Sequence, residues 1–396
     1  MKKQFLNLGK QPIANGFLNK NQIKDEFFYN LRVGFDEKTK LVTQMEYIDL
    51  PLMFNENYAY RGSMSKTMVN HFKVLSNYIK EILIKPLYPK PKILEIGSND
   101  GVFIKNFDPE NIIAVEPCSN FAKETENLGY TTYPEFWTVE LANKIKEKYG
   151  KQDIIFSANC MCHIPDLNET FKAINLALSD DGIFIFEDPS LAEMINNNSY
   201  DQIYDEHAHI FSVIALDNIL KENGLEIVGV KNLKVHGGSN RIFVKKINTS
   251  TPHKSVEQNK SHERVLGLDN FETFITFAKK VEQSKKDLIS LLTQCKKENK
   301  KVISYGATSK STTVFNYCNI GTDLIQYITD TTPEKQDKLS PGVHIPIISP
   351  EKGFDNSVDY AYLGAWNFIN EISKKEDNFL ANGGKFITHV PIVKII

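Results

Sequence analysis

The sequence predicts an α/β protein with two doubly wound, Rossmann-like units, the first preceded by a small N-terminal α+β segment. From Lys92 onward, short apolar runs typical of buried strands alternate with helical patterns. A glycine turn, Gly97–Gly101, closes the first of these runs, at the edge where such a sheet holds a ligand. A second strand–turn–helix–strand series begins near residue 299, so the last hundred residues are expected to form a separate unit.

The N-terminal segment, residues 1–66, mixes the strand-like runs FFYNLRVGF and KLVTQMEYI with turn residues. A helical pattern follows, in which apolar side chains recur every three or four residues. They are Met68, Phe72, Leu75, Ile79 and Leu83. Three prolines, Pro86, Pro89 and Pro91, end this helix because proline lacks the amide hydrogen that a helix needs.

Residues 67–248 contain the first α/β unit. Its predicted strands are KILEIG, IIAVEP, DIIFSAN, GIFIFEDP, LEIVGVKNLKV and RIFVKKI, with a helix around Leu216–Asn223. The last two strands are separated by His236–Ser239, a loop too short for a parallel crossover. We therefore expect a hairpin there, with one antiparallel strand at the edge of the sheet.

Residues 249–298 are polar, rich in lysine and helical in pattern, and they predict a connecting helix. Acidic side chains are interleaved with the lysines, which favours a solvated face over a polyanion site. In the C-terminal unit, residues 299–396, a turn and helix (GATSKSTTVFNYC) separate the strands VISYG and LIQYITD. Later strands are YAYLGAW and KFITHVPIV.

Composition limits the classes of function. The chain has 396 residues, enough for two or three domains, with 47 basic against 49 acidic side chains. A dedicated nucleic-acid binder would be strongly basic, so we expect no nucleic-acid partner. No apolar stretch approaches membrane length and the N-terminus has no apolar signal region, so we expect no membrane partner. No obligate protein partner is evident.

The five cysteines are scattered and odd in number. They predict reduced thiols and a cytoplasmic location, not a disulfide framework. No pair of C-x-x-C motifs occurs, which excludes a four-cysteine zinc site.

The glycine turn has the features of a cofactor loop, because glycines allow a sharp turn and close approach to a ligand. Glu116 follows Glu95 by 21 residues, at the end of the next strand, where an acid can bind both hydroxyls of an adenosyl ribose. The spacing Gly97-x-x-x-Gly101 lacks the G-x-G-x-x-G pattern, and Asp100 would repel a pyrophosphate. These features disfavour NAD and FAD and favour a cofactor with a sulfonium and an amino group.

The pattern E-x-G-x-x-x-G resembles motif I of the class I S-adenosylmethionine-dependent methyltransferases; otherwise it is an ordinary glycine turn. The resemblance implies S-adenosylmethionine as cofactor. It places Asn159, at the end of DIIFSAN, near the methionine portion, and Phe136, after the third strand, near the adenine. The candidate cofactor-binding residues are Glu95, Gly97, Ser98, Asn99, Asp100, Gly101, Glu116, Pro117, Phe136 and Asn159.

A second group of polar residues lies in Tyr204–Ser212, after GIFIFEDPS, on the side of the sheet where α/β enzymes bind ligands. It includes His207 next to Glu206. A histidine beside a carboxylate can be held in one tautomer and act as a base near neutral pH. The alternative is a surface loop with two hydrogen-bonded histidines.

Nearly the whole chain resembles the nucleotide-sugar C-methyltransferases, enzymes that methylate C-3 of TDP-4-keto sugars in deoxysugar biosynthesis. The similar segments are LGKQPIANGFL, Met53-Phe54, Tyr60-x-x-Ser63-x-Ser65, LEIGSNDG, VEP, NCMCHIPD, Tyr204–Ser212, Gly237-Gly238-Ser239-x-Arg241, Tyr305-Gly306-Ala307-x-x-Lys310, Asp330-x-x-Pro333-x-Lys335-Gln336 and PGVHIPI. So many segments in one order make a chance similarity improbable.

The resemblance implies catalytic roles, because the family's Tyr-x-Glu-His pattern falls on Tyr204, Glu206 and His207. His207 would be the base that removes a proton α to the ketone, with Glu206 orienting its imidazole. Tyr204, Tyr60 or an amide would donate a hydrogen bond to the enolate oxygen, and the enolate carbon would attack the sulfonium methyl. No metal is required.

Three other histidines are weaker candidates for a catalytic or substrate-binding role. His163, in NCMCHIPD, is either a second catalytic candidate near the cofactor or a structural histidine. The family pattern does not require His209, which we expect to be structural. His236 is a candidate for the wall of the sugar pocket.

The predicted substrate-binding residues are Tyr58, Ser63, His236, Arg241, Gly306 and Lys310. Gly306 and Lys310 stand between a strand and a helix, where backbone amides and a lysine can hold a phosphate. The family places the nucleotide near this unit; alternatively, Gly306 is only a tight turn.

The family's N-terminal zinc site, two C-x-x-C pairs, has no counterpart here: Phe35 and Lys38 stand where the second pair would fall. The N-terminal segment is therefore expected to be metal-free. Three other functions remain open: transfer to a sugar oxygen or nitrogen, a NAD-dependent sugar oxidoreductase, and a non-catalytic scaffold.

Overall fold

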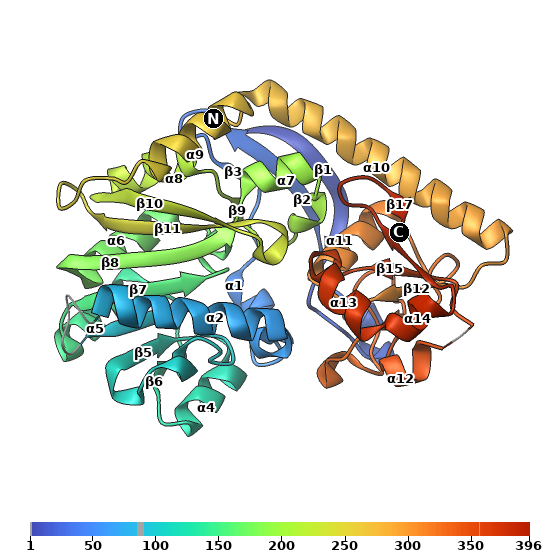
Figure 1. Ribbon diagram of the computed structural model, residues 1–396, viewed down its shortest axis with the longest axis horizontal. Helices are drawn as coiled ribbons and strands as arrows, with labels where there is room; N and C mark the ends of the chain where they lie inside the picture. Colours follow the sequence, from blue (N-terminus) through green and yellow to red (C-terminus); the bar gives the residue numbers. More distant parts are fainter. Residues whose placement is uncertain (1, 85–90, 356) are drawn as a thin grey trace.

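The computed structural model describes residues 2–84, 91–355 and 357–396. In Figure 1 a seven-stranded sheet lies on the left and a six-stranded sheet on the right. Helix α10 (Phe271–Lys297) spans the top of the molecule between them. No helix in the described ranges combines the length and apolar character that a membrane span requires.

The seven-stranded sheet confirms the first predicted α/β unit. Across the sheet, the strands are β6 (Thr131–Tyr133), β5 (Ile112–Val115), β4 (Ile93–Ile96), β7 (Gln152–Ala158), β8 (Leu178–Pro189), β11 (Ser239–Lys246) and β10 (Leu225–Leu233). The five strands from β6 to β8 are parallel. Their carboxyl ends therefore share one edge of the sheet.

Strands β10 and β11 form the predicted hairpin, but the expected edge position of the antiparallel strand is wrong. Strand β11 runs antiparallel to both β8 and β10 and lies between them. The physical reason is burial: most of β11 is buried, whereas β10 exposes side chains along its length, as an edge strand does. The edge strand β10 therefore points the same way as β8.

Helices cover this sheet. They are α2 (Lys66–Tyr78), α4 (Ser119–Asn127), α5 (Val139–Tyr149), α6 (Leu167–Ala177) and α8 (Val213–Glu222). Helix α7 (Leu191–Asn197) packs instead into the core of the N-terminal strands and the C-terminal unit. Helix α2 begins where Ser65 Oγ accepts a hydrogen bond from the Met68 amide, and its apolar stripe is buried as predicted. It continues as a π-helix, Ile79–Ile84, and Pro86 and Pro89 lie outside the described residues.

The N-terminal strands β1 (Lys2–Pro12), β2 (Phe28–Asp36) and β3 (Val42–Gln44) form a separate sheet with β9 (His209–Ile210). Because Thr43 pairs with His209, this sheet carries the end of the Tyr204–Ser212 segment. The N-terminal segment is thus joined to the candidate catalytic loop by strand pairing.

The prediction of a single connecting helix is wrong in one respect. The segment forms two helices, α9 (Ser255–Val265) and α10. Gly267, at φ +71°, breaks the helical path, and the Asn270 side chain caps α10 by accepting from the Glu272 amide.

The C-terminal unit has the predicted strand–helix–strand order. Its strands, across the sheet, are β14 (Ile347–Ile348), β13 (Ile328–Thr329), β12 (Val302–Tyr305), β15 (Tyr360–Leu363), β16 (Lys385–Thr388) and β17 (Lys394–Ile395), all parallel except β17. Its helices are α11 (Ser309–Cys318), α12 (Pro350–Gly353), α13 (Ile369–Lys375) and α14 (Asp377–Ala381). Buried side chains of β1, β2, α10, α11 and β12 form one continuous core, so the N-terminal strands pack against this unit.

Candidate active site

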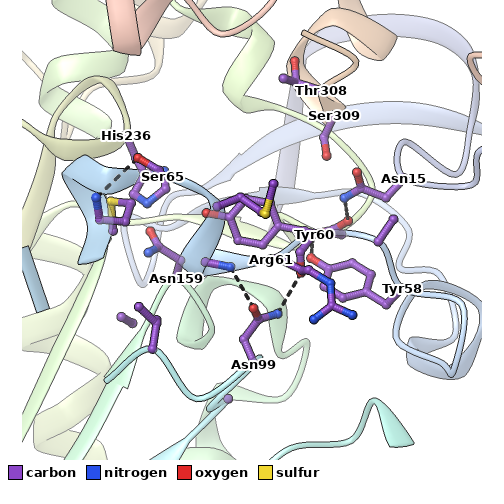
Figure 2. A pocket seen from close by; sticks show the side chains of 18 of the residues that line it. Asn15, Tyr58, Tyr60, Arg61, Ser65, Asn99, Asn159, His236, Thr308 and Ser309 are labelled. Carbon is purple, nitrogen blue, oxygen red and sulfur yellow. Dashed lines mark hydrogen bonds between the residues drawn. The ribbon is translucent and has the colours of Figure 1, made fainter. Parts of the chain in front are cut away.

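A cavity of about 440 Å³ lies where the carboxyl ends of β4, β5 and β7 face the C-terminal unit. Its wall combines the glycine turn, the segment around Tyr58–Ser65, the loop before β9 and the start of α11. In Figure 2, Asn99 and Asn159 lie on one side of this cavity, and Thr308 and Ser309 lie on the other. The predicted cofactor and phosphate sites therefore border one space.

The glycine turn needs its glycines for packing as well as for conformation. Gly97 has φ +77° and Gly101 has φ +78°, a region that side chains disfavour. A Cβ on Gly97 would lie 2.9 Å from Cys160 Cβ, and one on Gly101 would lie 2.9 Å from Thr125 Cγ2. Both contacts are too short, so substitution would displace the turn.

Two buried carboxyl groups face the cavity beside this turn. Glu116 accepts hydrogen bonds from the amides of Asn99 (2.6 Å) and Cys118 (2.8 Å), and Glu95 Oε2 has no hydrogen-bond partner among the described residues. Burial raises the pKa of both carboxyl groups. A cationic ligand would satisfy these carboxyl groups and reverse the shift, so the residues present fit a sulfonium cofactor with an amino group.

The other predicted cofactor residues divide into two groups. Ser98, Asn99, Pro117, Phe136 and Asn159 line the cavity, as do Glu95, Gly97 and Glu116. Asp100 and Gly101 do not, which corrects the expectation that Asp100 faces the ligand. Asp100 is buried behind the turn, where its Oδ2 accepts hydrogen bonds from the amide and hydroxyl of Ser63.

Ser63 is therefore corrected too: it holds the glycine turn and does not line the cavity. Asn99 also bonds to the segment that contains Ser63, through two backbone groups. Its Oδ1 accepts from the Gly62 amide (2.9 Å) and its Nδ2 donates to the Tyr60 carbonyl (3.0 Å). The segment that carries Tyr58 and Tyr60 is thus fastened to the cofactor loop. Both tyrosines line the cavity, and Tyr60 is 40% exposed.

His207 is buried and held in one tautomer. Its Nδ1 lies 2.6 Å from the carbonyl oxygen of Gln202, and its Nε2 lies 2.7 Å from the Tyr204 hydroxyl. Because a carbonyl only accepts, the neutral ring carries its proton on Nδ1 and accepts from Tyr204 on Nε2. Burial lowers the pKa of His207 well below its usual range, so the ring is an uncharged base at neutral pH.

Glu206 does not orient this ring, which corrects the sequence-based expectation. Its Oε1 accepts from Asn15 Nδ2 (2.5 Å) and its Oε2 accepts from the Tyr58 hydroxyl (2.8 Å). Burial raises the pKa of Glu206. The orienting group is the Gln202 backbone carbonyl, which side-chain patterns do not reveal.

Asn15 is a site residue that sequence reasoning did not single out. Besides its bond to Glu206, it lines the cavity, and the neighbouring Ala14 amide donates to Asp205 Oδ1 (3.0 Å). The available signal was its place in LGKQPIANGFL, a segment that resembles the family.

His163 and His207 stack at 5.3 Å between ring centroids, and Phe54 stacks on the other side of His163 at the same distance. Burial lowers the pKa of His163 to about 3. With Cys162 these histidines bring three ligand-type atoms within 4.8 Å. The two rings, however, lie at 23° to each other, so their nitrogen lone pairs lie in nearly parallel planes that do not converge on one ion. Both nitrogens of His207 also have partners already, so we assign no metal centre.

His209 behaves as a structural residue. Its Nε2 lies 3.2 Å from the carbonyl oxygens of Ile164 and Pro165, and burial lowers its pKa to about 4. It therefore ties β9 to the segment that precedes α6.

The C-terminal side of the cavity carries a lysine. Lys310 Nζ lies 3.3 Å from Asn367 Oδ1 and 3.4 Å from the His236 carbonyl. Within the described ranges, no carboxylate comes within ion-pair distance of it. Gly306 lines the cavity beside it, and Thr308 caps helix α11. This is a cationic helix start that faces open space.

Of the remaining predicted substrate residues, His236 lines the cavity and Arg241 does not. Burial lowers the pKa of His236 to about 3. Arg241 Nε donates to Glu187 Oε1 (2.6 Å), and His71 Nε2 lies 2.6 Å from the other oxygen of that carboxylate. The predicted role of Arg241 in substrate binding is thus corrected: Arg241 forms a buried ion pair that joins β11 to β8.

Comparisons with known proteins agree with this geometry. Residues 70–230 match a family model described as a methyltransferase domain, and residues 234–391 match one described as the C-methyltransferase C-terminal domain. C-methyltransferase NovU of Streptomyces niveus is 30% identical over 397 residues, which cover 99% of this chain and 93% of that protein.

Solved structures resemble only part of the chain. The CurJ carbon methyltransferase has 14% identity and a TM-score of 0.36, covering 46% of this chain and 56% of that one. An S-adenosylmethionine-dependent methyltransferase from Anabaena variabilis has 13% identity and a TM-score of 0.34, covering 44% and 83%. At such scores the assignment rests on the sequence matches.

Proposed function

This chain belongs to the C-methyltransferase family and is an S-adenosylmethionine-dependent methyltransferase; from that premise we propose that it methylates a ring carbon of a nucleotide-linked 4-keto sugar. The single observation that carries the proposal is the 2.6 Å contact between His207 Nδ1 and the Gln202 carbonyl, at the wall of the cavity that the glycine turn borders, because it leaves Nε2 as the basic nitrogen. A base of this kind is what formation of an enolate requires.

The proposed reaction begins when His207 Nε2 takes a proton from the carbon next to the ketone. The electron pair left on that carbon delocalises onto the carbonyl oxygen, and the Tyr204 hydroxyl turns from Nε2 to donate to it. When bound, S-adenosylmethionine supplies the electrophilic methyl group that this carbon attacks. The Gln202 carbonyl stabilises the resulting imidazolium through Nδ1–H.

The charge of the site supports a cationic cofactor on one side and an anionic substrate group on the other. Glu95 and Glu116 border the cavity at the glycine turn. On the opposite wall, Lys310 and the first amides of α11 can bind the diphosphate of a sugar nucleotide. The keto sugar would then lie between them, against His207 and Tyr60.

The remaining sequence-based expectations are part of this proposal. They are the division at residues 66, 248 and 298, the lack of a nucleic-acid, membrane or obligate protein partner, and a cytoplasmic location. The five cysteines are free thiols, which suits a reducing compartment.

The test is product analysis with a panel of TDP-, GDP- and CDP-linked 4-keto sugars. Mass spectrometry should show the gain of one methyl group, and NMR should place it on carbon. An O-methyl singlet would contradict the carbon assignment. Calorimetry covers the oxidoreductase alternative: NAD binding without S-adenosylhomocysteine binding would overturn the proposal.

A further inference from the structure

Trp366 lies where three functional segments meet. Its Nε1 donates to Asp201 Oδ2 (2.6 Å), in the segment that leads to the catalytic loop. Lys310 Nζ lies 5.2 Å from the centroid of its ring. A Cβ on Gly237 would lie 2.5 Å from Trp366 Cη2, so the turn between β10 and β11 needs glycine there to admit the ring.

The partner of this tryptophan is a fully buried carboxylate. Burial alone would raise the pKa of Asp201, but its contacts with His389 and Trp366 and the nearby Lys310 ammonium outweigh burial and lower it. His389 Nε2 lies 3.6 Å from Asp201 Oδ1, and the Tyr362 hydroxyl lies 2.8 Å from His389 Nδ1. Asp201 is therefore an ionised side chain of the first unit enclosed by residues of the C-terminal unit.

This contact is one residue away from the group that orients the base. Asp201 precedes Gln202, whose carbonyl accepts the Nδ1 proton of His207. On the far side of Gln202, the Ile203 carbonyl accepts from Thr313 Oγ1 in α11 (3.1 Å). The backbone that carries the orienting carbonyl is thus held at both ends by the C-terminal unit.

Trp366 is not among the residues that line the cavity, so we assign it no contact with the substrate. We infer that Trp366 and Asp201 are positioning residues that couple the anion site at Lys310 to the orientation of His207. This inference rests on the proposed function. Binding a diphosphate at Lys310 would restrain the ring that Lys310 overlies, and through Asp201 the Gln202 carbonyl.

A set of variants tests the coupling. Trp366→Phe keeps an aromatic side chain but removes the N–H donor along with part of the indole, and Asp201→Asn removes the charge. Tyr327→Phe, which removes a hydroxyl-to-Gly353 bond elsewhere in the same unit, is the control. The first two should each lower kcat about tenfold or more, with the KM for sugar nucleotide and the Kd for S-adenosylhomocysteine within about twofold. The control should change none of these.

The kcat of the double variant distinguishes a shared positioning role from a general loss of stability. If both residues act through one bond, the double variant should lose no more kcat than the worse single variant. Additive losses, or a parallel fall in S-adenosylhomocysteine affinity and melting temperature, would overturn the inference. Unchanged kcat in both single variants would overturn it as well.

Hydrogen exchange of the 200–207 peptide keeps the inference testable if the sugar assignment fails. Trp366→Phe should speed exchange there, and TDP should slow exchange in the native protein but not in this variant. Absence of any TDP effect on the native protein would count against the nucleotide assignment. Identical exchange in native protein and variant, without TDP, would count against the Trp366–Asp201 coupling itself.

Discussion

The carbonyl oxygen of Gln202 lies 2.6 Å from Nδ1 of His207, and this contact decides which nitrogen of the ring can act as the proposed base. A carbonyl cannot donate, so the proton stays on Nδ1 and the lone pair stays on Nε2. Glu206 bonds to Asn15 and Tyr58 and shapes the wall of the cavity instead. The two neighbouring side chains therefore have different roles, which substitution can separate.

His207→Ala should lower kcat by about 10²–10⁴-fold, the usual contribution of a general base. Affinity for S-adenosylhomocysteine, measured by calorimetry, should change little, because the glycine turn and Glu116 are untouched. Equal losses of binding and turnover would show that His207 belongs to the cofactor site.

Glu206→Gln should cost less than loss of His207. The amide oxygen can still accept from Asn15, so the expected effect is a rise in KM for the sugar nucleotide of about tenfold or less, with kcat nearly retained. Steady-state kinetics measures both constants. A kcat loss as large as that of His207→Ala would make Glu206 the better candidate for the base.

The activity should tolerate mild acid. The base works uncharged, and burial lowers the pKa of His207 well below 6.5, so kcat/KM should stay flat as the pH falls through 6.5. An ordinary histidine would lose half its activity there. An acidic limb centred at or above pH 6.5 would contradict the assignment.

His163 should make the free energy of unfolding fall as the pH is lowered below 6.5. Its pKa is about 3 when folded and 6.5 when unfolded, so below pH 6.5 the unfolded chain binds the extra proton and stability falls. Between pH 7 and 5 this one group should remove roughly 2 kcal/mol of unfolding free energy. Denaturant titrations of native protein and His163→Gln should differ by that change; parallel pH dependence would contradict it.

Gly97→Ala should destabilise the protein and abolish cofactor binding, since its Cβ would meet Cys160 at 2.9 Å. Gly129→Ala is a matched control, because Gly129 also has a positive φ (+91°) but a Cβ there would have no atom within 4 Å. The control should cost only about 1–2 kcal/mol of backbone strain and leave S-adenosylhomocysteine affinity intact. Equal effects in thermal melts and calorimetry would show that the contact with Cys160 is unimportant.

Lys310→Gln should weaken inhibition by TDP about tenfold without changing S-adenosylhomocysteine affinity, because Lys310 lines the cavity and its ammonium contacts only uncharged oxygens among the described residues. Lys144→Gln, which removes an exposed lysine paired with Glu135, is the charge-matched control. Equal inhibition of both variants by TDP would remove Lys310 from the substrate site.

Much of the fold was predictable because it is encoded locally. The apolar runs predicted the parallel strands, and the two glycines predicted the turn after the first of them. Both signals depend only on residues close together in the sequence: the spacing of apolar side chains and the residue types that form turns. The place of β11 was not predictable in this way. A hairpin loop shows that two strands are antiparallel, but the burial of each strand decides which one faces β8.

In the site, the amino-acid sequence and its family resemblance predicted His207 as the base candidate, the glycine turn as the candidate cofactor loop and Lys310 as a candidate anion-binding residue, and all three line the cavity. The partners of the other polar side chains depended on the folded chain. Asn15 and Glu206 are 191 residues apart, Ser63 turns to Asp100, and Arg241 turns to Glu187. Local pattern shows which side chains carry chemistry; long-range packing selects the partners that satisfy them, because a buried polar group must be paired wherever the chain brings it.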